Sequence, residues 1–432
     1  MCENSSYGVN ERGNLTLGGM DTVDLAHKYG TPLMLMDEDI IRETMRMYRS
    51  SIEKHYEGRG LCCYASKAFS CKQIYRVCME EGFGVDTVSM GELHTAMSVG
   101  FDPHTICYHG NNKTSEELRY ALSQGVDRIV ADSYHELDLL DEIAGEIGVK
   151  AGVLLRLSPG IDAHTHDFVR TGQIDSKFGF AISLGDAMKA VRQALSKPNL
   201  VLRGIHCHIG SQIFELAPFE HAAEVMLGFL ADVRRETGAE LSELNLGGGF
   251  GIRYTAEDDP LPYGQYMEVV SDTLHRVCRQ MDMALPFVII EPGRSIVGAA
   301  GVTLYEIGNV KEIEGVRTYV SIDGGMTDNI RYALYGAKYE FTVANRCADP
   351  KTHIVTVAGR CCESGDLLGK DVALQECGVG DILAVLATGA YNYSMASNYN
   401  RVPRPEVVML RGGKDVPAVR RESIEDLLRN DV

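Results

Sequence analysis

The stretch LCCYASKAFSCKQIYRVCMEEGFGVDTV, residues 61–88, contains the unit from which the fold is built. A short apolar run, LCCYA, leads into polar residues and a segment with helix-like spacing of apolar side chains, and a second apolar run, GVDTV, follows. Short continuous apolar runs are typical of strands buried on both faces, and a helix between two such strands makes them parallel. The stretch therefore predicts a strand, a helix and a second, parallel strand.

The same alternation continues to residue 291. The short apolar runs are LCCYA (61–65), GVDTV (84–88), TICYH (105–109), RIVAD (128–132), GVLLRL (152–157), LRGIHCH (202–208), ELNL (243–246) and FVIIE (287–291). Segments between them, such as 114–124, 184–196 and 219–237, carry apolar residues at helical spacing. This α/β pattern, with about eight repeats, indicates a closed (β/α)8 barrel. A doubly wound open sheet is the alternative that periodicity alone does not exclude.

Polar residues gather at the far ends of these runs. They are Lys67, Asp86, His109, Asp132, Arg156, His208, Gly247 to Gly249, and Glu291. Because barrel enzymes keep their chemistry at the carboxyl ends of the strands, this set marks the expected site.

A different pattern begins after Glu291. Runs such as GVTLYEIGNV (301–310) and DILAVLATG (381–389) are rich in Val, Ile, Thr and Tyr, which favours a separate C-terminal β domain. The early run TPLMLMD (31–37) is expected to add an N-terminal strand to it. The predicted organisation is an N-terminal segment, 1–36, a barrel, 37–291, and a β domain, 292–432.

Composition narrows the class of protein. The net charge of −18 has no basic cluster beside it, which argues against nucleic acid and anionic membranes as partners. No apolar run is long enough to span a bilayer, and the amino terminus lacks the features of a signal peptide, so we expect a cytoplasmic protein. The 12 cysteines contain no CxxC pair, which disfavours a zinc site and predicts reduced thiols in the core.

Two of the strand ends each allow a structural and a ligand-binding interpretation. Lys67 can be a solvated surface charge, or it can be an amine that forms a Schiff base. In LNLGGGFG (244–251), consecutive glycines either make a tight turn or let backbone amides approach a phosphate. A dinucleotide fingerprint fails here, because Ile252 stands where GxGxxG requires glycine.

Two further motifs each allow two interpretations. In GIHCHIGSQ (204–212), His206 and His208 share one face of a strand, as two metal ligands or as a stacking ring and a structural neighbour. The pair lies near the sixth strand and lacks an obvious carboxylate ligand, so we expect no metal. In IIEPGRS (289–295), Glu291 can belong to a charged rim or can pair with a ring nitrogen beside an anion-binding turn.

Six motifs in this order resemble one family. They are YASKAFS (64–70), HCHIGSQ (206–212), LGGGFGI (246–252), EPGRS (291–295), GRCCESGD (359–366) and ATGAYNYSMASNYN (387–400). From about residue 30 to 412 the chain is similar to the diaminopimelate decarboxylases, within the alanine-racemase-like, fold-type III pyridoxal phosphate (PLP) family. The resemblance implies PLP as cofactor and decarboxylation of meso-2,6-diaminopimelate to L-lysine and CO2, the last step of lysine biosynthesis.

The resemblance also implies roles for residues around the cofactor. Lys67 would form the Schiff base with PLP, and Asp86 would lie near that lysine. His208 would stack on the cofactor ring, and Glu291 would pair with the protonated pyridine nitrogen. The phosphate or its surroundings would be held by Ser211, Gly249, Gly293, Arg294 and Tyr391.

The substrate side follows from the same resemblance. It implies a homodimer in which Cys362 of the second subunit protonates the reaction intermediate and Glu363 of that subunit touches the substrate. A distal carboxylate suits arginine, and Arg331 in DGGMTDNIRYALYGA (323–337) meets that need. The expected substrate-binding residues are Arg294, Arg331, Tyr335, Glu363 and Tyr391.

Glu291 favours decarboxylation over the related racemisation. A carboxylate keeps the pyridine nitrogen protonated and the electron sink strong, whereas alanine racemases present an arginine there. A related decarboxylase of another basic amino acid, such as a D-amino acid, ornithine, lysine or carboxynorspermidine, is the first alternative. A non-catalytic PLP-binding regulator and a barrel metallohydrolase are the others.

Overall fold

The computed structural model describes residues 7–161 and 176–432, and these form two compact units. The barrel unit comprises 44–251 and 260–293. The β unit comprises 1–43, 252–259 and 294–432, of which 1–6 lie outside the described residues. Each helix among the described residues is too short or too polar to cross a membrane.

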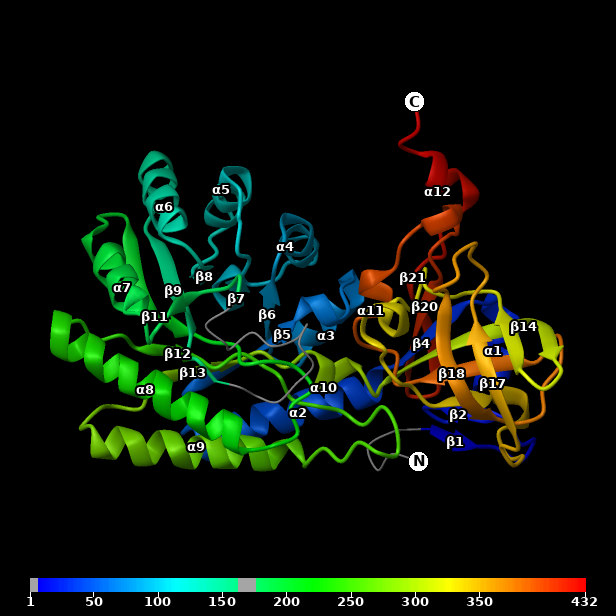
Figure 1. The fold of residues 1–432 in the computed structure, drawn as a ribbon. Coiled ribbons are helices and arrows are strands. Elements are labelled where there is room, and N and C mark those ends of the chain that lie inside the picture. Colours follow the sequence, from blue (N-terminus) through cyan, green and yellow to red (C-terminus); the bar gives the residue numbers. More distant parts are fainter. Residues whose placement is uncertain (1–6, 162–175) are drawn as a thin grey trace. The chain divides into compact units, whose positions relative to one another are not determined.

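The barrel unit is a closed ring of parallel strands (Figure 1). In ring order the strands are β5 Gly60–Ala65, β6 Gly84–Thr87, β7 Ile106–Tyr108, β8 Ile129–Ala131, β9 Ala151–Ser158, β11 Leu200–His206, β12 Glu243–Asn245 and β13 Phe287–Ile290. β13 pairs with β5, which closes the ring, and the short β10 (Phe180–Ala181) adds to β9. The predicted (β/α)8 barrel is confirmed, and the open sheet is excluded.

Helices alternate with these strands. They are α2 Glu38–His55, α3 Lys72–Glu80, α4 Met90–Met97, α5 Ser115–Ser123, α6 Tyr134–Ile147, α7 Asp186–Ser196, α8 Ala217–Thr237 and α9 Tyr263–Gln280. The helical segments expected at 114–124, 184–196 and 219–237 are α5, α7 and α8. Local signals set several ends: Thr114 and Glu117 form a reciprocal capping box at α5, and Gly148 ends α6 in the left-handed conformation.

Small residues let the barrel strands approach one another. A Cβ on Gly84 would lie 2.2 Å from the carbonyl oxygen of Thr105, and one on Gly204 would lie 1.9 Å from that of Glu243.

Cys63 and Cys107 help to fill one apolar cluster of the barrel. The described cysteines are all free, and most are buried, so the prediction of reduced core thiols is confirmed for them.

The β unit is built around a strand from the amino-terminal part of the chain. β4 (Leu33–Asp37) pairs antiparallel with β14 (Gly301–Ile313) and parallel with β20 (Glu406–Arg411). The other strands of this unit are β1 Tyr7–Val9, β2 Leu15–Leu17, β3 Met20–Asp21, β15 Arg317–Ile322, β16 Phe341–Val343, β17 His353–Ala358, β18 Leu367–Leu374, β19 Ile382–Leu386 and β21 Lys414–Val419. Its helices are α1 Thr22–Tyr29, α10 Arg294–Val297, α11 Arg331–Tyr335 and α12 Ile424–Leu428. The predicted β domain with an added N-terminal strand is confirmed.

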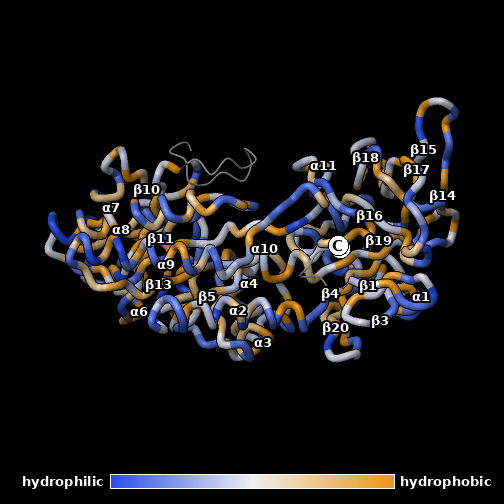
Figure 2. Tube along the Cα trace, turned by 90° about the horizontal axis from the view of Figure 1, so that it is seen from below, coloured by the Kyte–Doolittle hydropathy of each residue, from blue (hydrophilic) through white to orange (hydrophobic). Residues whose placement is uncertain are grey.

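Two features of the β unit differ from a simple continuous domain. Residues 252–259, expected within the barrel, belong to this unit because Ile252 and Tyr254 pack in its apolar core with Tyr305 and Phe341. The hairpin formed by β14 and β15 extends beyond the other strands of the unit (Figure 2). The first feature matters for the chemistry, because it brings Tyr254 to the arginines of the β unit.

Candidate active site

Polar side chains meet at the carboxyl ends of the barrel strands. Lys67 follows β5 in a short 3-10 turn, and Asp86 lies within β6. His109 follows β7, His206 ends β11, Asn245 ends β12, and Glu291 follows β13. The parallel ring therefore gathers residues that are far apart in the sequence at one rim.

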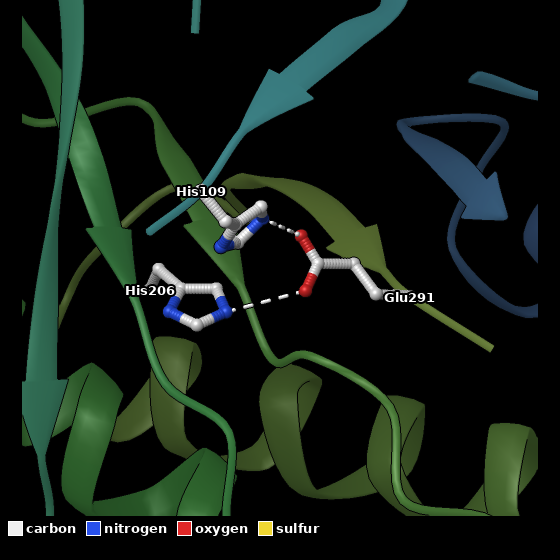
Figure 3. A group of neighbouring side chains, drawn as sticks. All are labelled: His109, His206 and Glu291. Atoms are coloured by element: carbon white, nitrogen blue, oxygen red, sulfur yellow. Dashed lines mark hydrogen bonds and ion pairs between the residues drawn. The ribbon is translucent and has the colours of Figure 1, made fainter. Parts of the chain in front are cut away.

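Glu291 is the centre of this group (Figure 3). Its Oε1 accepts hydrogen bonds from His109 Nε2 at 2.8 Å and from Asn245 Nδ2 at 2.6 Å. Its Oε2 accepts one from His206 Nε2 at 3.2 Å. All four side chains are buried, so these hydrogen bonds act in a medium of low dielectric.

The surroundings of Glu291 hold it as a carboxylate. Burial alone would raise its pKa, but the charge interaction with His109 and the hydrogen bonds from His109 and His206 lower the pKa well below its ordinary value. The amide of Asn245 is oriented by Gly247, whose backbone N–H donates to Oδ1 at 2.8 Å and so turns the NH2 group toward Glu291. The site thus contains a fixed, buried anion.

His206 contributes as a neutral ring. Burial lowers its pKa to about 3, so at neutral pH the imidazole is uncharged, and Nε2 carries the proton that it donates to Glu291. Nδ1 has no hydrogen-bond partner among the described residues. The ring also packs edge-on against His109, with centroids 4.9 Å apart.

The same three residues form a group that could hold a metal ion. One ligand atom from each of His109, His206 and Glu291 lies within 4.8 Å of the others. His206 meets His109 here, so the group differs from the His206 and His208 pair considered from the sequence. Hydrogen bonds already account for the contacts of Glu291 with both rings, and the absence of a metal stays an expectation.

Lys67 and Asp86 lie within electrostatic reach of one another, as expected. Burial raises the pKa of Asp86, and nearby His109 and Lys67 oppose that rise. Asp86 Oδ1 lies 3.8 Å from His109 Nε2 and has no hydrogen-bond partner in the described part of the chain. Lys67 itself is exposed, whereas Asp86 is buried.

His208 and the glycine loop after β12 lie next to each other. The backbone N–H of Gly248 donates to His208 Nδ1 at 3.3 Å. Burial, and then the charges of Lys67 and Arg156, lower the pKa of His208 well below its ordinary value, so this ring is also neutral. A neutral, half-buried imidazole is suited to stacking on an aromatic ligand.

The glycine loop brings backbone close to the end of β13. Gly247 and Gly249 have positive φ angles of 67° and 115°, and a Cβ on Gly248 would lie 2.2 Å from the carbonyl oxygen of Glu291. Within the described residues, the backbone N–H groups of Gly249 and Gly293 donate to no acceptor. Two such donors near a glycine-rich turn are suited to an anion such as phosphate.

A second group lies in the β unit and contains two buried arginines. Arg331 Nη1 donates to Tyr254 OH at 3.1 Å and to Tyr339 OH at 2.7 Å. Arg294 Nη1 also donates to Tyr254 OH, and the Arg294 guanidinium lies 4.7 Å from the centroid of the Tyr391 ring. Arg331 forms no ion pair with a carboxylate among the described residues. Arg331 is therefore a buried positive charge without a carboxylate partner among the described residues.

The remaining predicted residues also belong to the β unit, apart from Ser211. Tyr335 is the last residue of α11 and is half-buried, and Tyr391 has a positive φ of 61°. Cys362 and Glu363 are exposed, and the Cys362 backbone N–H donates to Asn400 Oδ1 at 2.8 Å. Ser211 lies in the barrel unit just beyond β11.

Three residues of these groups could not be recognised from the sequence motifs. Asn245 lies within an apolar run, and Tyr254 and Tyr339 belong to none of the six motifs. A weak signal existed for Asn245, which is a polar residue at the carboxyl end of an apolar run. No spacing rule connects Tyr254 with Arg331, because they are 77 positions apart.

Comparison with known proteins identifies the family. Residues 38–298 match the family model described as "Pyridoxal-dependent decarboxylase, pyridoxal binding domain". The chain belongs to this family. It is 49% identical over 414 residues to diaminopimelate decarboxylase from Bacillus methanolicus, covering 96% of each chain. The family resemblance drawn from the six motifs is therefore confirmed, and so is its cofactor, PLP.

Two solved structures show how far the likeness extends. A diaminopimelate decarboxylase from M. jannaschii, crystallised with L-lysine, has a TM-score of 0.92 and 33% identity, covering 100% of this chain and 99% of that one. A lysine/ornithine decarboxylase from Vibrio vulnificus, crystallised with putrescine, has a TM-score of 0.77 and 22% identity, covering 90% and 97%. The second likeness shows a shared fold only.

The barrel unit of this pyridoxal-dependent decarboxylase fits its cofactor. Glu291 Oε2 receives one hydrogen bond in the described part of the chain, so it can accept a second from a ring N–H. The unused N–H groups of Gly249 and Gly293 suit a phosphate, and the exposed amine of Lys67 suits a carbonyl. The carboxylate, the two backbone N–H groups and the amine therefore match a protonated pyridine that carries a phosphate and an aldehyde.

Proposed function

We propose that the protein decarboxylates meso-2,6-diaminopimelate, with PLP as cofactor, and releases CO2 and L-lysine. The observation that carries this proposal is the buried Arg331 guanidinium, which no carboxylate of the described chain neutralises. Leaving such a charge unpaired is costly, so a ligand with a carboxylate is the natural partner. Diaminopimelate has a distal carboxylate, whereas lysine and ornithine do not.

In this function the barrel unit holds the cofactor. Lys67 would attach it, Glu291 would pair with its ring nitrogen, and His208 would stack on its ring. The phosphate group or its surroundings are held by Ser211, Gly249, Gly293, Arg294 and Tyr391, and Asp86 lies near the attaching lysine. Bound PLP supplies the sink for the electron pair left on the α-carbon when CO2 departs.

The charge of Glu291 explains why decarboxylation is favoured. Three donors keep the carboxylate ionised in a buried place, so it stabilises a positive charge on its ring partner and keeps the proton there. Neutral His206 adds no competing positive charge beside it. The chain therefore maintains the protonated ring nitrogen on which the sink depends.

The substrate side uses the β unit. Arg331, with Arg294 and Tyr335, binds the distal carboxylate, and Tyr391 and Glu363 complete the contacts. We infer a homodimer with shared active sites, in which Cys362 of the second subunit gives a proton to the α-carbon in place of CO2. The exposure of Cys362 and Glu363 supports this assembly. The cytoplasmic location expected from the sequence is part of the proposal.

The test is the release of CO2 from meso-diaminopimelate, L-lysine and L-ornithine, with and without added PLP. The native enzyme should prefer diaminopimelate. Arg331→Gln should lower kcat/KM for diaminopimelate by about 10- to 100-fold, because a hydrogen bond to a charged group contributes about 1.5 to 3 kcal/mol. The absorbance of PLP bound to Arg331→Gln should not change. The kcat/KM of Arg331→Lys for diaminopimelate should lie between those of the native enzyme and Arg331→Gln, since lysine keeps the charge without the planar guanidinium.

Two outcomes would overturn the proposal. Equal turnover of lysine or ornithine by the native enzyme would favour the related decarboxylases of other basic amino acids. A protein that binds PLP but releases no CO2 from any of the three compounds would be a PLP-binding regulator.

A further inference from the structure

Tyr254 links the two buried arginines of the β unit. Its hydroxyl oxygen accepts a hydrogen bond from Arg331 Nη1 at 3.1 Å and another from Arg294 Nη1. Both guanidinium groups also lie near its ring, at 5.1 Å for Arg331 and 5.7 Å for Arg294. Tyr254 is buried, at 8% exposure, so little solvent reaches these contacts.

A count of donors and acceptors separates Tyr254 from its neighbour Tyr339. Tyr339 OH accepts from Arg331 and donates its own proton to Asn392 Oδ1 at 3.3 Å. Tyr254 OH accepts from two arginines, which fills its acceptor positions, and its proton goes to no acceptor in the described part of the chain. A buried hydroxyl that keeps an unused proton normally has a ligand or water as its partner.

We propose that Tyr254 is a further substrate-binding residue, whose phenolic O–H donates a hydrogen bond to the distal carboxylate of the substrate. The inference rests on the proposed function, because it assigns a third donor to the anion that Arg331 binds. It applies to amino acids with a second carboxylate, and it gives no contact to lysine.

The arginines also make this phenol a stronger donor. Burial alone would raise the pKa of Tyr254, but the positive charges of Arg294 and Arg331 and their hydrogen bonds lower the pKa below its ordinary value. A more acidic phenol forms a stronger hydrogen bond with a carboxylate. The two guanidinium groups and the hydroxyl then offer hydrogen-bond donors to one carboxylate. Lysine has no distal carboxylate and would leave these donors without an acceptor.

The test compares Tyr254→Phe with the matched control Tyr339→Phe. Each substitution removes one acceptor of Arg331. Tyr254→Phe also removes an acceptor of Arg294 and the unused donor, whereas Tyr339→Phe also removes the donor to Asn392. Tyr254→Phe should raise KM for meso-diaminopimelate by about 10- to 100-fold, whereas Tyr339→Phe should raise it by about threefold. Inhibition by L-lysine and the absorbance of bound PLP should stay close to native in Tyr254→Phe.

The outcomes separate this inference from the proposed function. The native enzyme is assayed first, and a failure to release CO2 from diaminopimelate would remove the proposed function. With native turnover established, equal rises of KM in the two variants would show that Tyr254 only supports the arginines, and the inference would be wrong. An equal loss of affinity for L-lysine would also overturn it.

A fluorinated tyrosine at position 254 keeps the shape and the acceptor even if Tyr254→Phe folds poorly. Its phenol loses the proton at lower pH, so KM for diaminopimelate should begin to rise at lower pH than in the native enzyme. The groups that contact Tyr254 are Arg294, Arg331 and Tyr339, and Asp258 accepts from its backbone N–H. A pH dependence of KM identical to that of the native enzyme would contradict the assigned role of the O–H proton.

Discussion

Replacement of Glu291 by glutamine tests whether the buried charge of this residue drives catalysis. The two side chains have nearly the same shape, so Glu291→Gln removes the charge and little else. The amide oxygen of the new residue can still accept from His109 and Asn245, whose donors lie 2.8 and 2.6 Å from Oε1. On the other side the new NH2 group would meet His206, which can turn Nε2 into an acceptor by moving its proton to Nδ1.

The size of the effect follows from burial. Glu291 is 6% exposed, and the loss of one partner of a buried charge pair costs about 3 to 5 kcal/mol. If the protonated ring is needed in the transition state, this cost appears in kcat, and 1.36 kcal/mol corresponds to a factor of ten. Glu291→Gln should therefore lower kcat for diaminopimelate by about 10² to 10⁴.

The assay is CO2 release under saturating substrate and PLP. Borohydride reduction should still fix the cofactor on the variant, which shows that the loss does not come from an empty site. His109→Gln is the matched control, because its amide can donate from about the position of Nε2 and leaves the charge of Glu291 in place. A kcat of Glu291→Gln within about threefold of native would refute the role of the charge.

Two further predictions concern the lysine and the assembly. Borohydride should attach a pyridoxyl group to the peptide that contains Lys67, and Lys67→Ala should abolish turnover; a label on another lysine would remove the assignment. Inactive Lys67→Ala and Cys362→Ala chains should regain activity when mixed, since some heterodimers then have one intact site. No recovery, with exchange of subunits demonstrated by mass, would favour sites built within one chain.

The barrel could be predicted from the sequence because parallel strands are buried on both faces. Runs such as LCCYA and GVLLRL are continuous and apolar, and they became β5 and β9. The path of residues 252–259 could not be predicted in this way. Tyr254 and Ile252 follow the glycine loop directly, and only their packing against Tyr305 and Phe341 shows that they belong to the β unit.

The site residues could be predicted where a side chain with a reactive or charged group directly follows an apolar strand. Lys67, His208 and Glu291 stand out because an amine, an imidazole and a carboxylate follow apolar runs. His109 was also expected at this site, but its hydrogen bond to Glu291 and that of Asn245 could not be predicted, because a contact between residues 182 or 46 positions apart has no local pattern. Asn245 and His109 acquire their roles only when the closed ring brings β12 and β7 to the same rim as β13.

The two groups of buried charge have different roles, one in the chemistry and one in the choice of substrate. Glu291 is an anion that three protein donors already stabilise, and its proposed partner is the cofactor ring and not the distal end of the substrate. Among the residues that the structure describes, the Arg331 guanidinium has tyrosine partners and no carboxylate, so its charge is left for a ligand. A substrate without a distal carboxylate would leave that charge uncompensated, at a cost of about 1 to 3 kcal/mol. Selection of diaminopimelate therefore follows from what the β unit leaves unpaired, and the chemistry follows from what the barrel unit pairs.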